Sequence, residues 1–171
     1  TGGRVEIFLV RKIESRDEEL AKGDVRRVDV WRALGKSSKP LRFGSDVKVG
    51  RLDVRLAKRS DEDGLLEVWL STKSGEDIDE AVREVGAVPL PPYIKREADK
   101  DDVDRYQTVM ARVDGAVAAP TAGLHMTHSL LGRLSARGCE LTTITLHVGL
   151  GTFKPVMTED LDDHPMHAEW F

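Results

Sequence analysis

The sequence predicts an α+β / α/β chain in two parts. A small antiparallel β-barrel domain is expected over residues 1–88, followed by part of an α/β catalytic domain with a βαβ unit over residues 89–171. Three observations predict this division. Apolar residues alternate with period two through residues 1–75, which is typical of strands. Three prolines within four residues then fix an extended segment just after residue 88. Beyond them, two short apolar runs flank a helical pattern.

The strands of the first part are indicated by apolar residues at every second position. Three runs show this alternation, at residues 5–9, 51–56 and 66–70. The turn Asp61-Glu62-Asp63-Gly64 joins the last two runs as a hairpin. Several short antiparallel strands separated by turns favour a small barrel or sandwich.

A helix is predicted between the strands and the prolines. Apolar residues recur at helical spacing from Ile78 to Val85, acidic residues occupy the first turn, and Gly86 follows as a stop. After the prolines, the stretch from Lys95 to Asp104 is charged and has no apolar period, which indicates an exposed loop.

The second part carries two histidine-bearing glycine and threonine turns, at residues 120–125 and 147–153. Each follows a short apolar run, at residues 115–119 and 141–146. This order of strand, loop, helix and strand predicts a right-handed parallel crossover, in which both turns leave the same edge of a sheet. The helix between the runs is indicated by Leu130, Leu131 and Leu134, with Gly138 as its stop.

The two turns carry groups suited to a polar ligand. The imidazoles of His125 and His147 can take or give a proton at neutral pH. Thr121, Thr152 and nearby backbone N–H groups can bind oxyanions or hydroxyls. The pair Gly149-Leu150-Gly151 allows close backbone approach, but a third glycine is missing, so a Rossmann site is rejected. The residues alone predict a polar site with acid–base capacity.

A metal site is the alternative reading of the histidines. Three histidines and a carboxylate would suit zinc. Their spacing matches no strong metal signature, and Pro165 disfavours a helix that would hold two of them on one face. We therefore assign no metal ligand. The histidines concerned are His125, His128, His164 and His167, with Glu169 as the carboxylate.

Charge is distributed unevenly along the chain. The formal net charge is −4, yet residues 22–59 carry twelve Lys and Arg against four Asp, a local net of +8. A positive surface of this kind attracts phosphate backbones, and a solvated strand face is the alternative. The candidate nucleic-acid-binding residues are Arg51, Arg55, Lys58 and Arg59.

The remaining composition places limits on the class of protein. Charged residues make up 33% of the 171 residues, and no apolar run is long enough to span a bilayer. No signal peptide is visible, and Cys139 is the only cysteine, which fits a reducing compartment. We expect a cytoplasmic monomer without membrane contact, and both ends of the chain indicate a fragment.

Four sequence blocks of the chain form a specific set, and they are residues 88–94, 105–109, 115–125 and 145–153. Together they resemble the signature blocks of the S-adenosylmethionine:tRNA ribosyltransferase-isomerase family of queuosine biosynthesis, and they occur in the family's order. The match is continued by His164, Met166, His167 and Glu169. The resemblance covers essentially the whole chain, while the chain covers only the family's middle.

The resemblance implies a reaction and its partners. S-adenosylmethionine would donate its ribosyl group, as a substrate and without a further cofactor, to an aminomethyl-deazaguanine base at the tRNA wobble position. The product would be epoxyqueuosine, with release of adenine and methionine. His125 and His147 would carry the proton transfers, and Glu169 would hold the sulfonium or a protonated imidazole. The donor pocket would be lined by Thr121, Gly123, Gly149, Gly151 and Thr152.

Two other functions remain open from the sequence. The first is a non-catalytic RNA-binding module that uses the basic strand region. The second is a metal-dependent hydrolase built on the histidines. Under the family interpretation, the fragment by itself is expected to be inactive, because the family's flanking segments carry further substrate contacts.

Overall fold

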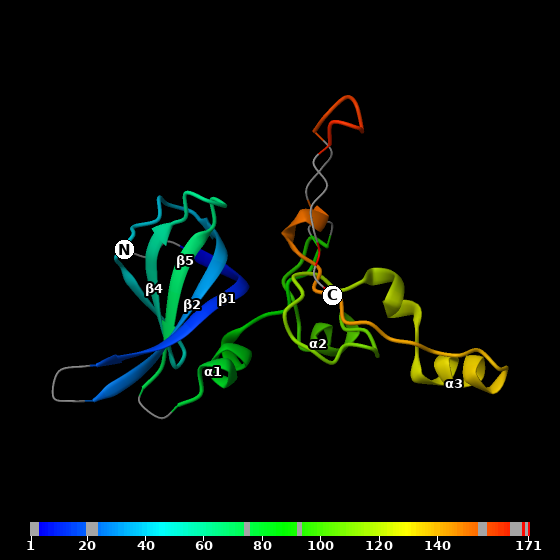
Figure 1. Cartoon of the computed structure of the whole chain (residues 1–171). Helices are drawn as coiled ribbons and strands as arrows, with labels where there is room; N and C mark the ends of the chain where they lie inside the picture. The colour runs from blue at the N-terminus through cyan, green and yellow to red at the C-terminus, as the bar shows by residue number, and fades with distance from the viewer. Residues whose placement is uncertain are drawn as a thin grey trace. The chain divides into compact units, whose positions relative to one another are not determined.

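The computed structural model describes most of the chain in two compact units, Thr1–Gly86 and Ala87–Phe171 (Figure 1). The first unit holds a β-sheet and a helix, and the second holds short helices joined by extended segments. The described residues therefore have an α+β fold. They are residues 4–19, 24–73, 76–91, 94–153, 157–164, 169 and 171.

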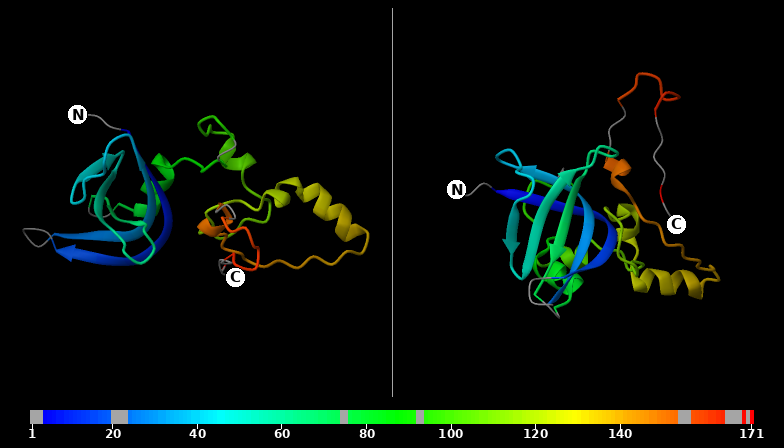
Figure 2. Two further views of the ribbon diagram at one scale, coloured as in Figure 1. Left: turned by 90° about the horizontal axis from the view of Figure 1, so that it is seen from above. Right: turned by 60° about the vertical axis from the view of Figure 1, so that its left-hand side comes forward.

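The first unit is built on a curved, five-stranded antiparallel sheet (Figure 2). The strands lie in the order β1-β2-β5-β4-β3. The turn after β3 contains Gly50 at φ +56°, and the turn after β4 contains Gly64 at φ +70°, where other residues would be strained. The hairpin predicted at residues 61–64 is confirmed. The bounds are β1 Val5–Glu19, β2 Val25–Ser37, β3 Asp46–Val49, β4 Leu52–Arg59 and β5 Leu66–Ser71.

The alternation of apolar residues forms the core as predicted. Directly paired residues of an antiparallel sheet point to the same face. Val68 pairs with Trp31 on β2 and with Leu56 on β4, and Leu70 pairs with Val54. This face is buried, and its members are no more than 4% exposed. They are Ala33, Leu52, Val54, Leu56, Leu66, Val68 and Leu70.

Helix α1, Ile78–Val85, covers this apolar face, and its predicted position is confirmed. The carboxylate of Asp77 caps the helix by accepting a hydrogen bond from the Glu80 backbone N–H at 2.8 Å. Ile78 and Ala81 are buried in the same cluster as the sheet residues. Gly86 ends the helix, and its N–H donates to the Val82 carbonyl at 2.8 Å.

The predicted closure of the sheet into a small β-barrel is not supported. A closed barrel requires hydrogen bonds between its first and last strands. Here β1 and β3 are the two edges of the sheet, and among the described residues they do not pair with each other. The reason is that α1 seals the apolar face, so the four-residue strand β3 needs only its single partner, β4.

Short helices and extended segments make up the described part of the second unit. The helix predicted from the three leucines is confirmed as α3, His128–Ala136. The Thr127 hydroxyl caps it by accepting from the Leu130 N–H at 3.1 Å. Gly138 follows at φ +84°, which only glycine adopts readily. The other elements are α2 Asp102–Arg105, η1 Thr121–His125 and η2 Leu150–Phe153.

The charged stretch at residues 95–104 is more ordered than an exposed loop. Arg96 donates two hydrogen bonds to Asp102, at 2.5 and 2.7 Å, and Asp102 is 5% exposed. The guanidinium of Arg96 and the backbone N–H of Asp99 lower the pKa of Asp102 to about 2. This ion pair closes the turn that leads into α2. Apolar periodicity could not predict it, because the side chains that form it are charged.

The predicted βαβ unit does not occur among the described residues. Residues 115–119 and 141–146 flank α3 as expected, but neither forms a strand. The strands of a parallel sheet are normally covered on both faces. Residues 141–146 lack such cover, because Leu141 is 53% and Ile144 is 78% exposed. The apolar residues of these two runs were therefore not sufficient to form the predicted parallel crossover.

Candidate functional site

Glu169 fastens the second histidine-bearing turn. One carboxylate oxygen, Oε2, accepts a hydrogen bond from the Gly149 backbone N–H at 2.5 Å. The other, Oε1, lies 3.3 Å from the Thr152 hydroxyl, which donates to it. Glu169 thus meets two predicted site residues of a turn 17 to 20 residues earlier, and Gly151 lies between these two, in η2. Charge-assisted hydrogen bonds of this kind hold a loop in one conformation.

His147 packs against the start of the first apolar run. A Cβ atom added to Gly115 would lie 2.9 Å from Nδ1 of the imidazole, and Gly115 has φ +132°. Only glycine therefore fits there. One residue further along, the Val148 carbonyl accepts from the Val117 N–H at 2.7 Å. The two apolar runs meet at these contacts, although they do not form strands.

The first histidine-bearing turn is the 3-10 helix η1, and it is open to solvent. Thr121 and His125 are exposed, and Gly123 lies against the side chain of Thr108. Among the contacts of the described residues, none joins His125 to His147 or to Glu169. A shared pocket for the two histidines therefore stays a prediction.

The four predicted nucleic-acid-binding cations all have partners within the first unit. Arg51 precedes β4 and donates to Glu84 of α1 at 2.7 Å, so its side chain lies toward the helix. The remaining partners are Asp46 for Arg55 at 4.0 Å, Glu67 for Lys58 at 3.7 Å and the Gly64 carbonyl for Arg59 at 2.7 Å.

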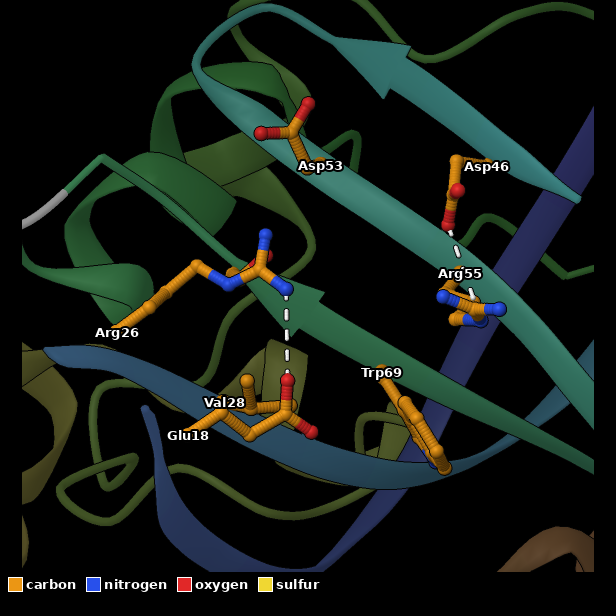
Figure 3. Close-up of a pocket in the computed structure, with 8 residues that line it drawn as sticks. Glu18, Arg26, Val28, Asp46, Asp53, Arg55 and Trp69 are labelled. Atoms are coloured by element: carbon orange, nitrogen blue, oxygen red, sulfur yellow. Dashed lines mark hydrogen bonds and ion pairs between the residues drawn. The ribbon is translucent and has the colours of Figure 1, made fainter. Parts of the chain in front are cut away.

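A hollow of about 210 Å³ lies on the face of the sheet opposite α1 (Figure 3). Trp69 forms part of its wall, and the guanidinium groups of Arg16 and Arg55 lie 4.4 and 5.8 Å from the centre of the indole ring. Sequence reasoning did not single out this tryptophan. The alternation of β5 could have identified it, because Trp69 lies between the core residues Val68 and Leu70 and its large ring therefore points away from the core. The lining is Glu18, Arg26, Val28, Asp46, Asp53, Arg55, Trp69 and Ser71.

Comparison with known proteins identifies the family. The family model described as "Queuosine biosynthesis protein" matches residues 1–171, the whole chain. The chain belongs to the queuosine biosynthesis protein family. No solved structure matches it.

Curated relatives of this queuosine biosynthesis protein carry the name S-adenosylmethionine:tRNA ribosyltransferase-isomerase. One from Sorangium cellulosum is 49% identical over 178 residues, which is 99% of this chain and 47% of the relative. One from Geobacter sulfurreducens is 50% identical over 99% of this chain and 46% of its own length. One from Magnetococcus marinus is 48% identical over 99% of this chain and 44% of its own length. The chain thus spans less than half the length of these relatives.

The queuosine family member also contains a buried ion pair that the sequence did not reveal. The side chain of Asp29 is 3% exposed and lies 2.6 Å from the Lys12 ammonium group, and it accepts a hydrogen bond from Ser15 at 2.6 Å. Burial raises the pKa of Asp29, but the hydrogen bonds from Lys12 and Ser15 outweigh it and lower this pKa below its usual value. Lys12 also donates to Asp79 on α1 at 3.2 Å. The cluster therefore ties β1, β2 and α1 together.

The described residues of this family member contain neither a cluster of metal ligands nor a helix suited to a membrane. Within them, no group of three or more His, Cys, Asp or Glu side chains is arranged to hold a metal ion. His167, part of the zinc alternative, lies outside the described residues. The described helices also include none that is long and apolar enough to cross a membrane.

Proposed function

We propose that this chain is the middle part of a S-adenosylmethionine:tRNA ribosyltransferase-isomerase. Its near-complete match, at 48–50% identity, to relatives of that name carries the proposal. The substrates would be S-adenosylmethionine and tRNA in the cytoplasm, with no further cofactor. The enzyme would transfer and isomerise the ribosyl group onto an aminomethyl-deazaguanine base at the wobble position, and release adenine and methionine.

The described contacts support specific roles for the residues of the second unit. The chemistry needs a base for the proton next to the sulfonium and an acid that helps adenine to leave. We assign these proton transfers to His125 and His147. The Thr121 hydroxyl and those backbone N–H groups of the two turns that do not donate to Glu169 would hold the donor. Residues assigned to the donor pocket are Thr121, Gly123, Gly149, Gly151 and Thr152.

Glu169 takes a narrower role than the resemblance implied. Both of its oxygens are engaged with the turn at residues 149–152. We therefore propose it as a positioning residue, which acts on the donor through Gly149 and Thr152. The two units would serve as two domains, with donor chemistry in the second and RNA contacts in the first.

A chimeric enzyme tests the proposed function. Residues 1–171 would replace the matching segment of the Sorangium cellulosum relative, which restores the length that the isolated chain lacks. We expect the chimera to release adenine from S-adenosylmethionine only when substrate tRNA is present, and the isolated chain to release none. Chromatography of adenine and analysis of the tRNA product measure both. A soluble chimera that binds tRNA without binding S-adenosylmethionine would instead support the non-catalytic RNA-binding module.

Replacement of Glu169 by glutamine in the chimera should weaken donor binding. The amide keeps the shape of the carboxylate but accepts weaker hydrogen bonds from Gly149 and Thr152. We expect KM for S-adenosylmethionine to rise by about tenfold, the equivalent of about 1.4 kcal/mol, with a smaller change in kcat. Glu159→Gln, an exposed residue nearby in sequence, is the matched control. A loss confined to kcat would show that Glu169 acts on the reacting atoms.

A further inference from the structure

The hollow around Trp69 lies on the polar outer face of the sheet. Val68 and Leu70 point to the core, so Trp69 between them points outward. Its direct partners across the sheet are Val30 on β2 and Arg55 on β4. Trp69 therefore occupies the middle of this face, with neighbouring strands on both sides.

The indole ring is held in place and exposed in part. Its Nε1–H donates to Glu67 at 3.1 Å, which fixes the plane of the ring. Arg55 beside it is loosely held, because its side chain is 48% exposed and its nearest Asp46 oxygen is 4.0 Å away. A planar ligand could thus displace Arg55 from the indole at small cost and keep the guanidinium as a hydrogen-bond donor.

The charged groups of the hollow suit the edge of a base better than a phosphate. Three carboxylates line it, from Glu18, Asp46 and Asp53, and only two guanidinium groups, from Arg26 and Arg55 (Figure 3). Each carboxylate has a cation partner, so the hollow offers paired donors and acceptors and not the group of unpaired cations that would select a phosphate. The pairs are Glu18 with Arg16 and Arg26, Asp46 with Arg55, and Asp53 with Lys48. The carboxylates can accept hydrogen bonds from the N–H groups of a base. The guanidinium groups can donate to its carbonyl oxygen and ring nitrogen atoms. Guanine carries both kinds of group on its edges.

Two further observations favour a base within RNA. At the rim, Lys48 pairs with Asp53 of the lining at 3.6 Å, and Lys58 pairs at 3.7 Å with Glu67, the acceptor of the Trp69 N–H. The side chains of these two lysines are 65% and 67% exposed. These lysines can contact phosphates on either side of a base that enters the hollow. A cavity of about 150 Å³ already holds a benzene ring, so 210 Å³ has room for a larger heterocycle.

We propose that the hollow binds one unpaired guanine base of the RNA substrate, stacked on Trp69 and distinct from the base that the second unit would modify. The inference rests on the proposed function for the identity of the RNA. Unpaired bases are recognised in this way, by stacking on aromatic rings and by hydrogen bonds to their edges. Asp53 accepts from the base, Arg26 and Arg55 donate to it, and the rim lysines hold the adjoining phosphates.

The test compares two RNA hairpins that differ in one loop nucleotide. One loop carries a single guanosine among uridines, and the matched loop carries uridine alone. We expect the 171-residue chain to bind the guanosine hairpin at least ~5-fold more tightly, the lower end of the range for stacking of one base. Trp69→Leu and Asp53→Asn should each remove most of this preference, and Trp69→Phe should keep it. The indole N–H resonance of Trp69, assigned with Trp69→Phe, should shift with the guanosine hairpin.

A control variant and a ligand control separate the other outcomes. Lys58→Gln should weaken both hairpins equally and lower the salt dependence by about one phosphate contact, with the preference intact. Equal binding of the two hairpins by the unaltered chain would overturn the proposal. So would an unchanged preference in folded Asp53→Asn, or a Trp69 resonance that moves with S-adenosylmethionine and not with RNA.

Kinetics of the chimera distinguish the base-binding hollow from the proposed enzyme function. In the active chimera, Trp69→Leu should raise KM for tRNA and leave KM for S-adenosylmethionine unchanged. Normal tRNA kinetics in that variant would reject the base-binding hollow while the enzyme function stands. Selective binding of the guanosine hairpin by an inactive chimera would reject the enzyme function while the hollow stands.

Discussion

Replacement of either predicted acid–base histidine should lower ribosyl transfer by at least ~100-fold. His147→Ala and His125→Ala, each made in the chimera, remove a group that can take or give a proton, and such groups contribute factors of this size. Affinity for S-adenosylmethionine should fall much less, because backbone N–H groups and threonine hydroxyls remain. Turnover and donor affinity are measured separately for each variant.

Companion variants distinguish chemistry from loop structure. His147 packs on Gly115, so its removal could also loosen the turn. His147→Gln keeps a polar side chain near that glycine but cannot relay a proton in the same pH range. It should lose turnover as severely as His147→Ala. His128→Ala, at the exposed start of α3, is the control and should retain activity. Near-normal turnover in both His125 and His147 variants would contradict the acid–base assignment.

Breaking the Lys12–Asp29 pair should produce the largest loss of stability in the first unit. Lys12→Met removes the nearer cation and leaves the buried carboxylate of Asp29 with only the Ser15 hydrogen bond and the exposed Arg27 at 3.7 Å, for which a cost of about 3 kcal/mol is expected. Urea unfolding followed by tryptophan fluorescence measures this, since Trp31 and Trp69 both lie in the unit. The control is Arg51→Met, which breaks an exposed pair with Glu84 and should cost at most about 1 kcal/mol.

The loss of stability at low pH should depend on the same Lys12–Asp29 pair. The pKa of Asp29 is lowered in the folded state, so its contribution is present above the unfolded value of about 3.9. That contribution is lost as the pH falls through the lower, folded pKa, because both states then bind the proton. In Lys12→Met, only the Ser15 hydrogen bond and the charge of Arg27 still oppose the effect of burial on this pKa, so the corresponding acid-dependent loss of stability should become smaller. An unchanged pH profile in Lys12→Met would show that Asp29 is not stabilised by Lys12.

Local sequence patterns predicted much of the first unit and one helix of the second unit. Alternation located β4, β5 and the start of β1, because neighbouring side chains of a strand point to opposite faces. The helices α1 and α3 were predicted from apolar spacing and from the stop residues Gly86 and Gly138. The caps at Asp77 and Thr127 came from the structure. The predicted βαβ unit was wrong, because its strands depend on pairing with residues distant in the sequence. Residues 141–146 are apolar, yet they form no strand because nothing among the described residues pairs with them.

The sequence by itself determined the family, the strands β4 and β5, the start of β1 and the two main helices, because each depends on patterns of residues close together in the chain. The tertiary structure alone decided the open sheet, the position of Arg51 beside α1 and the contact of Glu169 with Gly149 twenty residues earlier. It also decided the hollow around Trp69. These features depend on which residues of separate strands and turns face one another, and a shift of one residue in strand pairing would exchange the two faces of the sheet.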